Sequence, residues 1–407
     1  MRKNYFAKLL NYTKNVFKIE KSLSKLKDGR KNPTYKTAHV VLPVLIGFVI
    51  RIRSFNTLNN MMRENEFVNL LPRGMKLPKI DAIRDALKVV EIEGLRGMLT
   101  YQIRKARSNK VFENGTIDGY TVAAIDGTQT FNSDKKSCEK CLKALKKGKE
   151  AQRNFHNSVV ISTIGNGAKV VLDFEPYRAG EDEAKKDEGE LTAAKRLIQR
   201  FSSNNERLID VVVYDAIACN SEWINTCNEA SLETVVRVKN NNVDSIREIK
   251  KQVNKSTETA IWTDVGGYEN IKVFEGTFKM NNVAKPLRFI KFLMKKPNGK
   301  RSQIMIITTC FEMDIRTLFK IIRARQDIEN SIFHNLKTEC GLEHCFVHGG
   351  NAIEAVLCLM FIASNYMQLF YHRRIKKSVK TQVELIRQFV KGLYLLKRTP
   401  ELIFNTG

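Results

Sequence analysis

The sequence predicts an α/β protein whose central sheet is preceded and followed by helical regions. In the first 110 residues, apolar side chains recur at spacings of three and four, which is typical of amphipathic helices. From residue 120, short runs of β-branched residues alternate with helical patterns, which is typical of a sheet with crossover helices. The 407 residues, 43% of them hydrophobic, are enough for a large core and for two or three domains.

Residues 1–115 are predicted to form a helical domain. Its helical periodicity is clearest in Phe6–Leu26, Val40–Met62 and Ile80–Ile103. Lysine and arginine are spread along all three segments, so the domain is expected to be basic.

Residues 116–239 and 301–348 are predicted to form the sheet core. The pattern gives three strands, a helix, a strand, a helix and a strand, in that order. The strands are expected at 121–125, 158–164, 169–175, 209–214 and 234–238, and the helices at Glu188–Phe201 and Ser221–Ala230. This order predicts a ribonuclease-H-like core.

Residues 240–300 interrupt the core and are predicted to form a β-rich insertion. Its strand-like runs are 259–263, 271–275 and 286–294.

After the insertion, the chain is expected to return to the core. A strand at Gln303–Thr309 precedes a long helix over about 314–338. Residues 349–407 are predicted to form C-terminal helices, one at Ala352–Phe370 and one that ends near Lys397.

The net charge of +26 indicates a polyanionic partner, most simply DNA or RNA, because neutralised phosphates release counterions. An anionic membrane surface is the rival partner, but no basic amphipathic helix stands alone as an anchor. The most apolar stretch, Val40–Ile50, is too short to span a bilayer, and the first residues lack the pattern of a signal peptide. We therefore expect no membrane contact and a cytoplasmic, nucleoid-associated protein with mostly reduced cysteines.

Three acidic residues carry the strongest chemical signal. Asp126 closes the apolar run Val122–Ile125, Asp215 closes the run Val211–Tyr214, and Glu329 lies in a basic amphipathic segment. Two strand-end aspartates and a helical glutamate can hold a pair of Mg²⁺ ions about 3.5–4 Å apart beside a phosphodiester. Each aspartate alone is more often an ordinary surface acid, and Glu329 could form a salt bridge within its helix. The joint pattern favours a metal-dependent nucleic-acid enzyme.

The same residues lie in motifs that resemble those of bacterial insertion-sequence DDE transposases. The motifs are Ala124-Ile125-Asp126-Gly127-Thr128, Val213-Tyr214-Asp215-Ala216 and Ile328-Glu329-Asn330, with a lesser match at Asp187-Glu188-Gly189-Glu190-Leu191. The group that the chain resembles has its glutamate in a Tyr-Arg-Glu-Lys signature. The resemblance runs from about residue 30 to 370. It implies a transposase that hydrolyses DNA at transposon ends and joins the freed 3′-hydroxyl to target DNA.

The resemblance also implies roles for individual residues. Asp126, Asp215 and Glu329 would be the catalytic residues and the ligands of two Mg²⁺ ions, for which Mn²⁺ can substitute. Arg325 and Lys337 would contact the DNA backbone near the cut. The implied partner is double-stranded DNA, as terminal inverted repeats and target, bound by a homodimer.

The chain departs from the signature in two places. Ile322 stands where the tyrosine is expected, and Lys337 follows Glu329 by eight residues where the motif has seven. These departures keep two alternatives open. One is a non-catalytic DNA-binding protein derived from a degenerate element, and the other is a nuclease with a ribonuclease-H fold.

Further DNA contacts are expected outside the signature. The basic segment Lys135–Arg153 follows Asp126 closely, so Lys146 and Lys147 are predicted to contact the DNA backbone, although a solvated helix or loop is the alternative. Trp262 in the insertion could stack on a displaced base, but a buried core position is more common for tryptophan.

Cys138 and Cys141 have half of a zinc-finger spacing. Candidates for two further ligands are Cys340, His344, Cys345 and His348. Two reduced thiols are the simpler interpretation, because no second Cys-x-x-Cys occurs in the chain.

Overall fold

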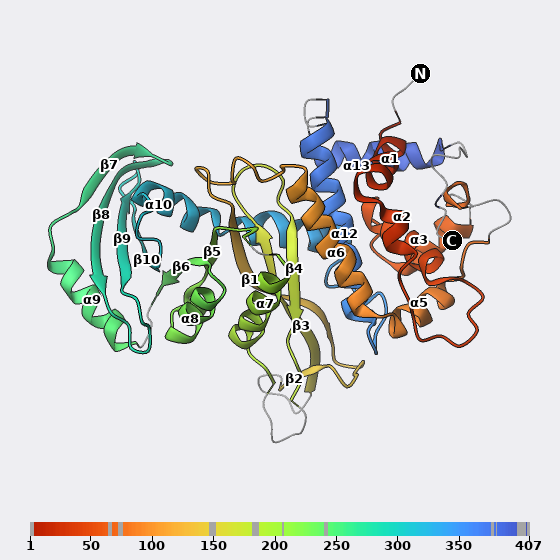
Figure 1. The fold of residues 1–407 in the computed structure, drawn as a ribbon, viewed down its shortest axis with the longest axis horizontal. Coiled ribbons are helices and arrows are strands. Elements are labelled where there is room, and N and C mark those ends of the chain that lie inside the picture. The colour runs from red at the N-terminus through yellow and green to blue at the C-terminus, as the bar shows by residue number, and fades with distance from the viewer. Residues whose placement is uncertain are drawn as a thin grey trace.

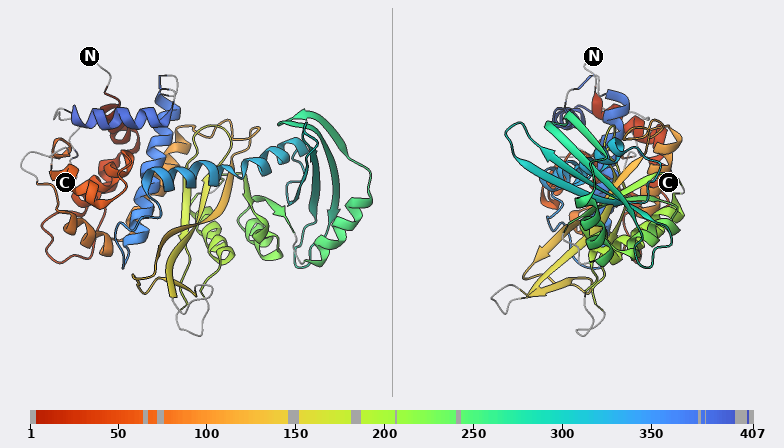
Figure 2. Two further views of the ribbon diagram at one scale, coloured as in Figure 1. Left: turned by 180° about the vertical axis from the view of Figure 1, so that it is seen from behind. Right: turned by 90° about the vertical axis from the view of Figure 1, so that its left-hand side faces the viewer.

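The computed structural model describes residues 4–63, 67–71, 76–145, 152–180, 187–205, 207–239, 243–375, 378–379, 381–396 and 404. They form an elongated molecule in which a helical region, a central sheet and the strands of the insertion follow one another along the long axis (Figures 1 and 2). The strands of this described part belong to a single ten-stranded sheet with the order β2-β3-β1-β5-β6-β10-β9-β8-β7, and β4 pairs with β3.

The centre of the sheet has the predicted order of strands and helices. Its elements are β1 (Val122–Ser133), β3 (Gln152–Thr163), β4 (Val171–Pro176), α7 (Glu190–Asn204), β5 (Val211–Tyr214), α8 (Ser221–Glu229) and β6 (Glu233–Val238). β1 pairs antiparallel with β3 and parallel with β5, and β5 pairs parallel with β6. This mixed arrangement confirms the predicted α/β fold with a ribonuclease-H-like core.

The continuous apolar runs of β1 and β5 follow from their central position in the sheet. Residues 122–125 and 211–214 are all buried, because strands covered on both faces do not alternate between apolar and polar residues. The basic segment after β1 contains a strand that the sequence did not predict, since β2 (Leu142–Leu145) pairs there with β3.

The insertion extends the same sheet. Its antiparallel strands are β7 (Ala260–Val265), β8 (Tyr268–Phe278) and β9 (Leu287–Lys295), followed by β10 (Arg301–Thr308). β10 pairs with β9 on one side and with β6 on the other, so that it joins the insertion to the core. The insertion also contains the helix α9 (Asp244–Lys255), which the strand-like pattern did not predict. Ile246, Ile249 and Val253 form its narrow buried stripe.

The N-terminal and C-terminal helices pack together into one helical region (Figure 1). Its elements are α1 (Tyr5–Phe17), α2 (Ile19–Leu23), α3 (Thr37–Val49), α4 (Phe55–Arg63), η1 (Val68–Leu70), α5 (Ile80–Val89), α6 (Ile92–Ser108), α12 (Ala352–Phe370), η4 (Tyr371–Ile375) and α13 (Gln382–Tyr394). α12 packs against α3, α5 and α6, and α1 packs against α13.

One helix in the described part is long and apolar enough to cross a membrane. It is Ala352–Ile375, which comprises α12 and η4, and 83% of its most apolar window is buried inside the protein. A helix that is apolar on all sides is expected at the centre of a large core. Its surroundings are therefore those of a core helix.

Candidate active site

Asp126 and Asp215 lie on neighbouring parallel strands. The β1–β5 ladder ends with the pairing of Ala124 and Val213, and each aspartate follows two residues later in the same direction. The prediction that Asp126 closes its strand is wrong, because β1 continues to Ser133 through its pairing with β3. Asp126 nevertheless lies beyond the end of β5, at the sheet edge where α/β folds place their sites.

Asp215 is oriented by the backbone that follows it. It caps the short 3₁₀ helix η2 (Ala216–Ala218), and its Oδ1 accepts a hydrogen bond of 2.9 Å from the backbone N–H of Ile217. Its Oδ2 lies 3.8 Å from Nζ of Lys239, and 31% of the side chain is exposed. One carboxylate oxygen is therefore fixed while the side chain still reaches solvent.

Glu329 lies on a π-helical turn, where a single long helix was expected. That helix is divided into α10 (Ile315–Ala324), η3 (Ile328–Phe333) and α11 (His334–Cys340). Asp327 anchors the turn through its Oδ2. This oxygen accepts a 3.0 Å hydrogen bond from the backbone N–H of Gly165 and forms a 3.0 Å ion pair with Nζ of Lys169. π-helical turns are rare and often lie at functional sites.

Arg325 lies between two of the predicted catalytic carboxylates. Its Nη2 is 3.1 Å from Oε1 of Glu329, and its Nη1 is 3.9 Å from Oδ2 of Asp126. Only 8% of the Arg325 side chain is exposed, whereas 49% of the Glu329 side chain is. The structure therefore places Arg325 as a buried counter-ion, and the i,i+4 salt bridge weighed for Glu329 is also present.

Asp126 lies in an electrostatic environment that opposes its ionisation. Burial raises its pKa to about 7, with further contributions from the charges of Glu329 and Glu190. Arg325 and the backbone N–H of Gly127, which donates to Oδ1 at 2.9 Å, act in the opposite direction. Arg325 therefore does not fully compensate the negative charges of the carboxylates around Asp126. Hard oxygen donors in this state suit a divalent cation such as Mg²⁺.

Glu190 is a fourth acid at this site, to which the sequence analysis assigned no role. Its oxygens accept hydrogen bonds from the hydroxyls of Tyr214 (2.8 Å) and Tyr177 (3.2 Å). A Cβ on Gly127 would lie 2.6 Å from Oη of Tyr177 and 2.7 Å from Oε2 of Glu190. The absence of a side chain at Gly127 therefore permits this close approach. The lesser motif match at residues 187–191 was the available signal.

The other predicted DNA-binding residues lie in different surroundings. Lys337 is on α11 and pairs with Glu343 at 2.8 Å. Lys146 and Lys147 lie outside the described residues. The prediction that Trp262 stacks on a displaced base is wrong. The residue is only 6% exposed and packs against the rings of Phe292 and Phe319. Its indole packs between the insertion and α10 and is not free to stack on a base.

Ile322 is buried on α10, at the position where the signature has a tyrosine. It lines a hollow of about 240 Å³ together with Arg325 and Tyr268. The Tyr268 hydroxyl accepts a 3.0 Å hydrogen bond from Nη1 of Arg323. A phenol from β8 is therefore present in the hollow where the signature tyrosine is missing.

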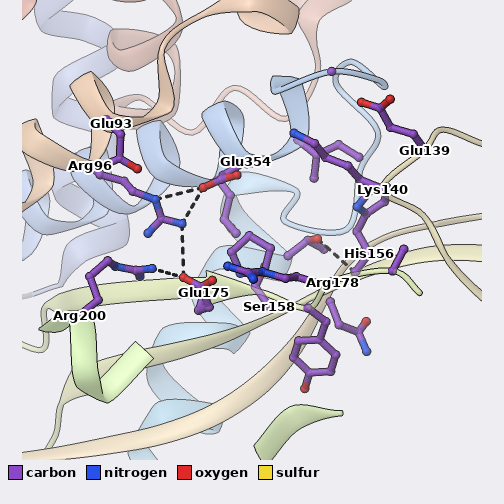
Figure 3. Close-up of a pocket in the computed structure, with 18 residues that line it drawn as sticks. Glu93, Arg96, Glu139, Lys140, His156, Ser158, Glu175, Arg178, Arg200 and Glu354 are labelled. Carbon is purple, nitrogen blue, oxygen red and sulfur yellow. Dashed lines mark hydrogen bonds and ion pairs between the residues drawn. The ribbon is translucent and has the colours of Figure 1, made fainter. Parts of the chain in front are cut away.

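A larger hollow of about 470 Å³ lies between β3, β4, α6 and α12 (Figure 3). Charged side chains point toward one another at one end of it. Arg96 pairs with Glu354 at 2.6 Å, and Arg200 pairs with Glu175 and, at 3.1 Å, with Asp173. Because these opposite charges pair with one another, the network ties α6, α7 and α12 to β4, and we assign it a structural role.

Comparisons with known proteins identify the family. A family model described as a transposase DDE domain matches residues 118–366, which is more than half of the chain and includes Asp126, Asp215 and Glu329. The solved structure of a piggyBac transposase synaptic complex with hairpin DNA is similar with a TM-score of 0.47 and 13% identity, over 97% of this chain and 80% of that chain. A comparison with curated proteins finds no match. Because the family model covers more than half of its residues, the chain belongs to the family of DDE transposases.

Proposed function

We propose that this transposase hydrolyses phosphodiesters at the terminal inverted repeats of an insertion sequence and transfers the freed 3′-hydroxyls into target DNA. Asp126, Asp215 and Glu329 are the proposed catalytic residues. The observation that carries the proposal is the register of β1 and β5, which brings the two aspartates to one sheet edge. The contacts of Arg325 with Asp126 and Glu329 support a common site.

The proposed metal ligands fit a pair of Mg²⁺ ions, or Mn²⁺ in their place. The donors are carboxylate oxygens, and the pKa of Asp126 is raised first by its burial and then by the negative charges of Glu329 and Glu190. When bound, the ions would activate the attacking oxygen and stabilise charge on the leaving oxygen. Asp126 and Asp215 would hold them from the sheet, and Glu329 from the π-helical turn.

The bonds exchanged in each step are defined by the products. In hydrolysis, a water oxygen bonds to phosphorus and the bond to the 3′-oxygen breaks, so that a proton ends on the 3′-hydroxyl. In strand transfer, that hydroxyl oxygen bonds to a target phosphorus, and the bond to the target 3′-oxygen breaks. The chain's side chains orient the phosphate and the attacking oxygen for both steps.

The DNA would reach the site across a basic surface. Arg237 and Arg323 line the hollow beside Arg325, within reach of a backbone that passes Glu329. The charge of +26 supplies sequence-independent affinity. We propose that two chains act together as a homodimer on DNA, because two transposon ends must be joined.

The test is cleavage and joining of DNA that carries the matched inverted repeats flanking the coding region. Asp126→Asn, Asp215→Asn and Glu329→Gln should each abolish Mg²⁺-dependent nicking and leave binding to the repeats intact. Glu269→Gln is the control, because it removes an exposed acid that pairs with Lys295 in the insertion. Substantial nicking by any of the three variants would contradict the assignment.

The buried Ile322 favours a second candidate, a DNA-binding protein that no longer cuts. It is distinguished by the wild-type protein, which would bind the repeats in a salt-sensitive manner and show no cleavage with Mg²⁺ or Mn²⁺. A nuclease would instead cut without the repeats and give no joined products.

A further inference from the structure

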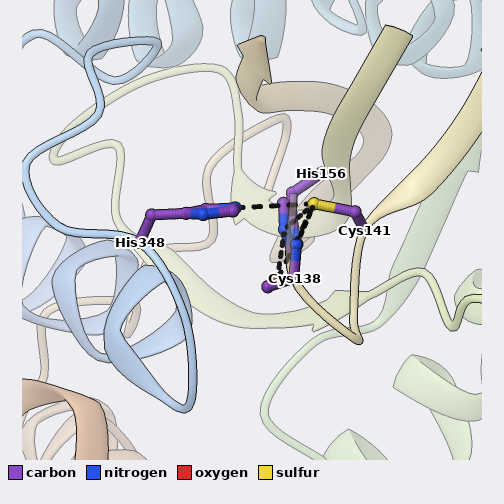
Figure 4. A group of neighbouring side chains, drawn as sticks. All are labelled: Cys138, Cys141, His156 and His348. Atoms are coloured by element: carbon purple, nitrogen blue, oxygen red, sulfur yellow. Dashed lines mark hydrogen bonds between the residues drawn. The ribbon is translucent and has the colours of Figure 1, made fainter. Parts of the chain in front are cut away.

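Two cysteines and two histidines from three separate segments meet beside the sheet (Figure 4). Cys138 and Cys141 lie in the loop between β1 and β2, His156 lies on β3, and His348 lies in the loop before α12. Their donor atoms all lie within 4.8 Å of one another. Within the described residues, this group meets that condition while the three catalytic carboxylates do not.

The separations between these donor atoms fit the edges of a tetrahedron around one ion. Zinc bonds of ~2.3 Å to sulfur and ~2.0 Å to nitrogen give edges of about 3.8 Å between two sulfurs and about 3.5 Å between sulfur and nitrogen. The Sγ atoms of Cys138 and Cys141 are 3.7 Å apart. Nε2 of His156 lies 3.4 Å from Sγ of Cys138 and 3.2 Å from Sγ of Cys141, and Nε2 of His348 lies 3.4 Å from Sγ of Cys141.

We propose that Cys138, Cys141, His156 and His348 bind a structural zinc ion. Sulfur and imidazole donors without a carboxylate select zinc over Mg²⁺, and four protein ligands leave no open position for a substrate. Binding releases the two thiol protons to solvent, and Zn²⁺ with two thiolates and two neutral imidazoles carries no net charge. Such a site can be enclosed at little electrostatic cost.

The surroundings of the four ligands support this assignment. The backbone N–H of Cys138 points to Sγ of Cys141 at 3.3 Å, which is a favourable contact for a metal-bound thiolate. The ring of Phe131 packs on His348 with centroids 4.6 Å apart and an interplanar angle of 32°. Cys141 is buried. The ligands are therefore partly buried, and neighbouring groups orient them.

The proposed ion would crosslink parts of the chain that are distant in sequence. His348 is 207 residues from Cys141, and it lies between α11 and α12. Zinc would thus link two loops. One lies between α11 and α12, after Glu329 in the chain, and the other lies between β1 and β2. This inference is independent of the proposed reaction, because it concerns the fold and not the chemistry at Asp126.

The remaining candidates from the sequence provide matched controls. Cys345 lies 3.9 Å from Nζ of Lys136, and His344 packs edge-on against Phe346. Neither belongs to the group of four. Cys345→Ser and His344→Asn therefore remove a nearby thiol or imidazole of the same kind without removing a proposed ligand.

The experiment measures zinc per chain by mass spectrometry after purification of the full chain under reducing conditions with zinc supplied. We expect about one zinc per wild-type chain, as a closed four-ligand site requires. The double variant Cys138→Ser/Cys141→Ser and the variant His348→Asn should lose most of it, and both controls should retain it. Cobalt-substituted wild-type protein should absorb as a tetrahedral thiolate complex, and this readout requires no variant to fold.

Three results would overturn the proposal. They are wild-type protein that binds no zinc or cobalt, controls that lose as much zinc as the ligand variants, and a disulfide between Cys138 and Cys141 in protein purified under reducing conditions. Because metal is counted on the protein itself, a catalytically inactive chain could still pass this test, and an active one could fail it.

Discussion

Strands β1 and β3 carry residues of two proposed metal sites with different chemistry. At Asp126 on β1, the charges of Glu190 and Glu329 act on the Asp126 carboxyl, and the guanidinium of Arg325 pairs with Asp126 and Glu329. The cluster at His156 on β3 consists of thiols and imidazoles that can neutralise a zinc ion completely. As proposed, the first cluster would be completed by cations and DNA phosphate, whereas the second would be completed by one ion.

This difference predicts opposite effects on stability. Like charges that are held together and partly buried oppose folding, because the unfolded chain can separate and hydrate them. Ligands of a structural metal favour folding, because the unfolded chain lacks the preformed site. The acidic site is therefore expected to reduce stability for the sake of catalysis, and the Cys/His cluster to increase it.

The largest expected effect tests how closely the acidic site is packed. In Gly127→Ala, the new methyl group must displace the Tyr177 hydroxyl and the Glu190 carboxylate, which lie within 2.7 Å of its ideal position. A shift of about 1 Å at reacting groups can reduce the rate about 100-fold, so we expect a loss of this size in the DNA nicking assay. The zinc content should be unchanged.

Gly97→Ala provides the control for this substitution. Its Cβ would meet nothing within 4 Å on α6, so that nicking should remain at the wild-type rate. Near-normal nicking by Gly127→Ala, or an equal loss in the two variants, would contradict the close packing proposed around Glu190.

The next prediction concerns the stability that the acidic site costs. The folded protein raises the pKa of Asp126 from 3.8 to about 7, mainly by burial. The free energy of unfolding is therefore highest when Asp126 is protonated in both the folded and the unfolded state. It falls as the pH rises from 3.8 to about 7. Asp126→Asn removes the charge and should stabilise the metal-free protein by about 2 kcal/mol at pH 8. The gain should shrink as the pH approaches 4.

Urea unfolding in the presence of a chelator, at two pH values, measures this gain. Asp215→Asn is the control, and a smaller change is expected because 31% of that side chain is exposed. In a separate unfolding series with zinc and no chelator, Cys141→Ser should lower stability. A destabilised Asp126→Asn at pH 8 would remove the proposed contrast between the two clusters.

The sequence predicted those parts of the protein that depend on local pattern. The apolar runs of β1 and β5 identified two central strands, and parallel neighbours necessarily bring Asp126 and Asp215 to one edge. The amphipathic pattern also located α10 and α11. It could not reveal the π-helical turn between them, because that turn depends on Asp327 binding Gly165 and Lys169 from a distant hairpin.

The parts that escaped prediction depend on contacts between distant segments. Glu190 joins the site through two tyrosine hydroxyls and the space left by Gly127. His156 is fifteen residues from Cys141 and lies on β3, whereas Cys141 lies in the loop before β2, so no ligand spacing marks it. Trp262 shows the converse, since the tryptophan considered for base stacking is buried against Phe292 of the insertion and Phe319 of α10.

The smallest expected effect concerns Arg325, which distinguishes a counter-ion from a DNA contact. Its guanidinium competes with cations for the oxygens of Asp126 and Glu329. Arg325→Gln should therefore lower the Mg²⁺ concentration for half-maximal nicking about fivefold, which corresponds to roughly 1 kcal/mol. The maximal rate should fall as well, because the two carboxylates lose their fixed partner. A titration of Mg²⁺ at saturating DNA measures both quantities.

Arg323→Gln is the matched control, because Arg323 is exposed and donates to the Tyr268 hydroxyl. It should weaken DNA binding and leave the Mg²⁺ requirement unchanged. If Arg325→Gln instead weakened DNA binding at an unchanged Mg²⁺ requirement, Arg325 would have the backbone-contact role that the sequence resemblance implied. The negative charge of the acidic site would then be compensated only when metal binds, and not by Arg325. The acidic site would differ from the Cys/His cluster even more than the pairing with Arg325 indicates.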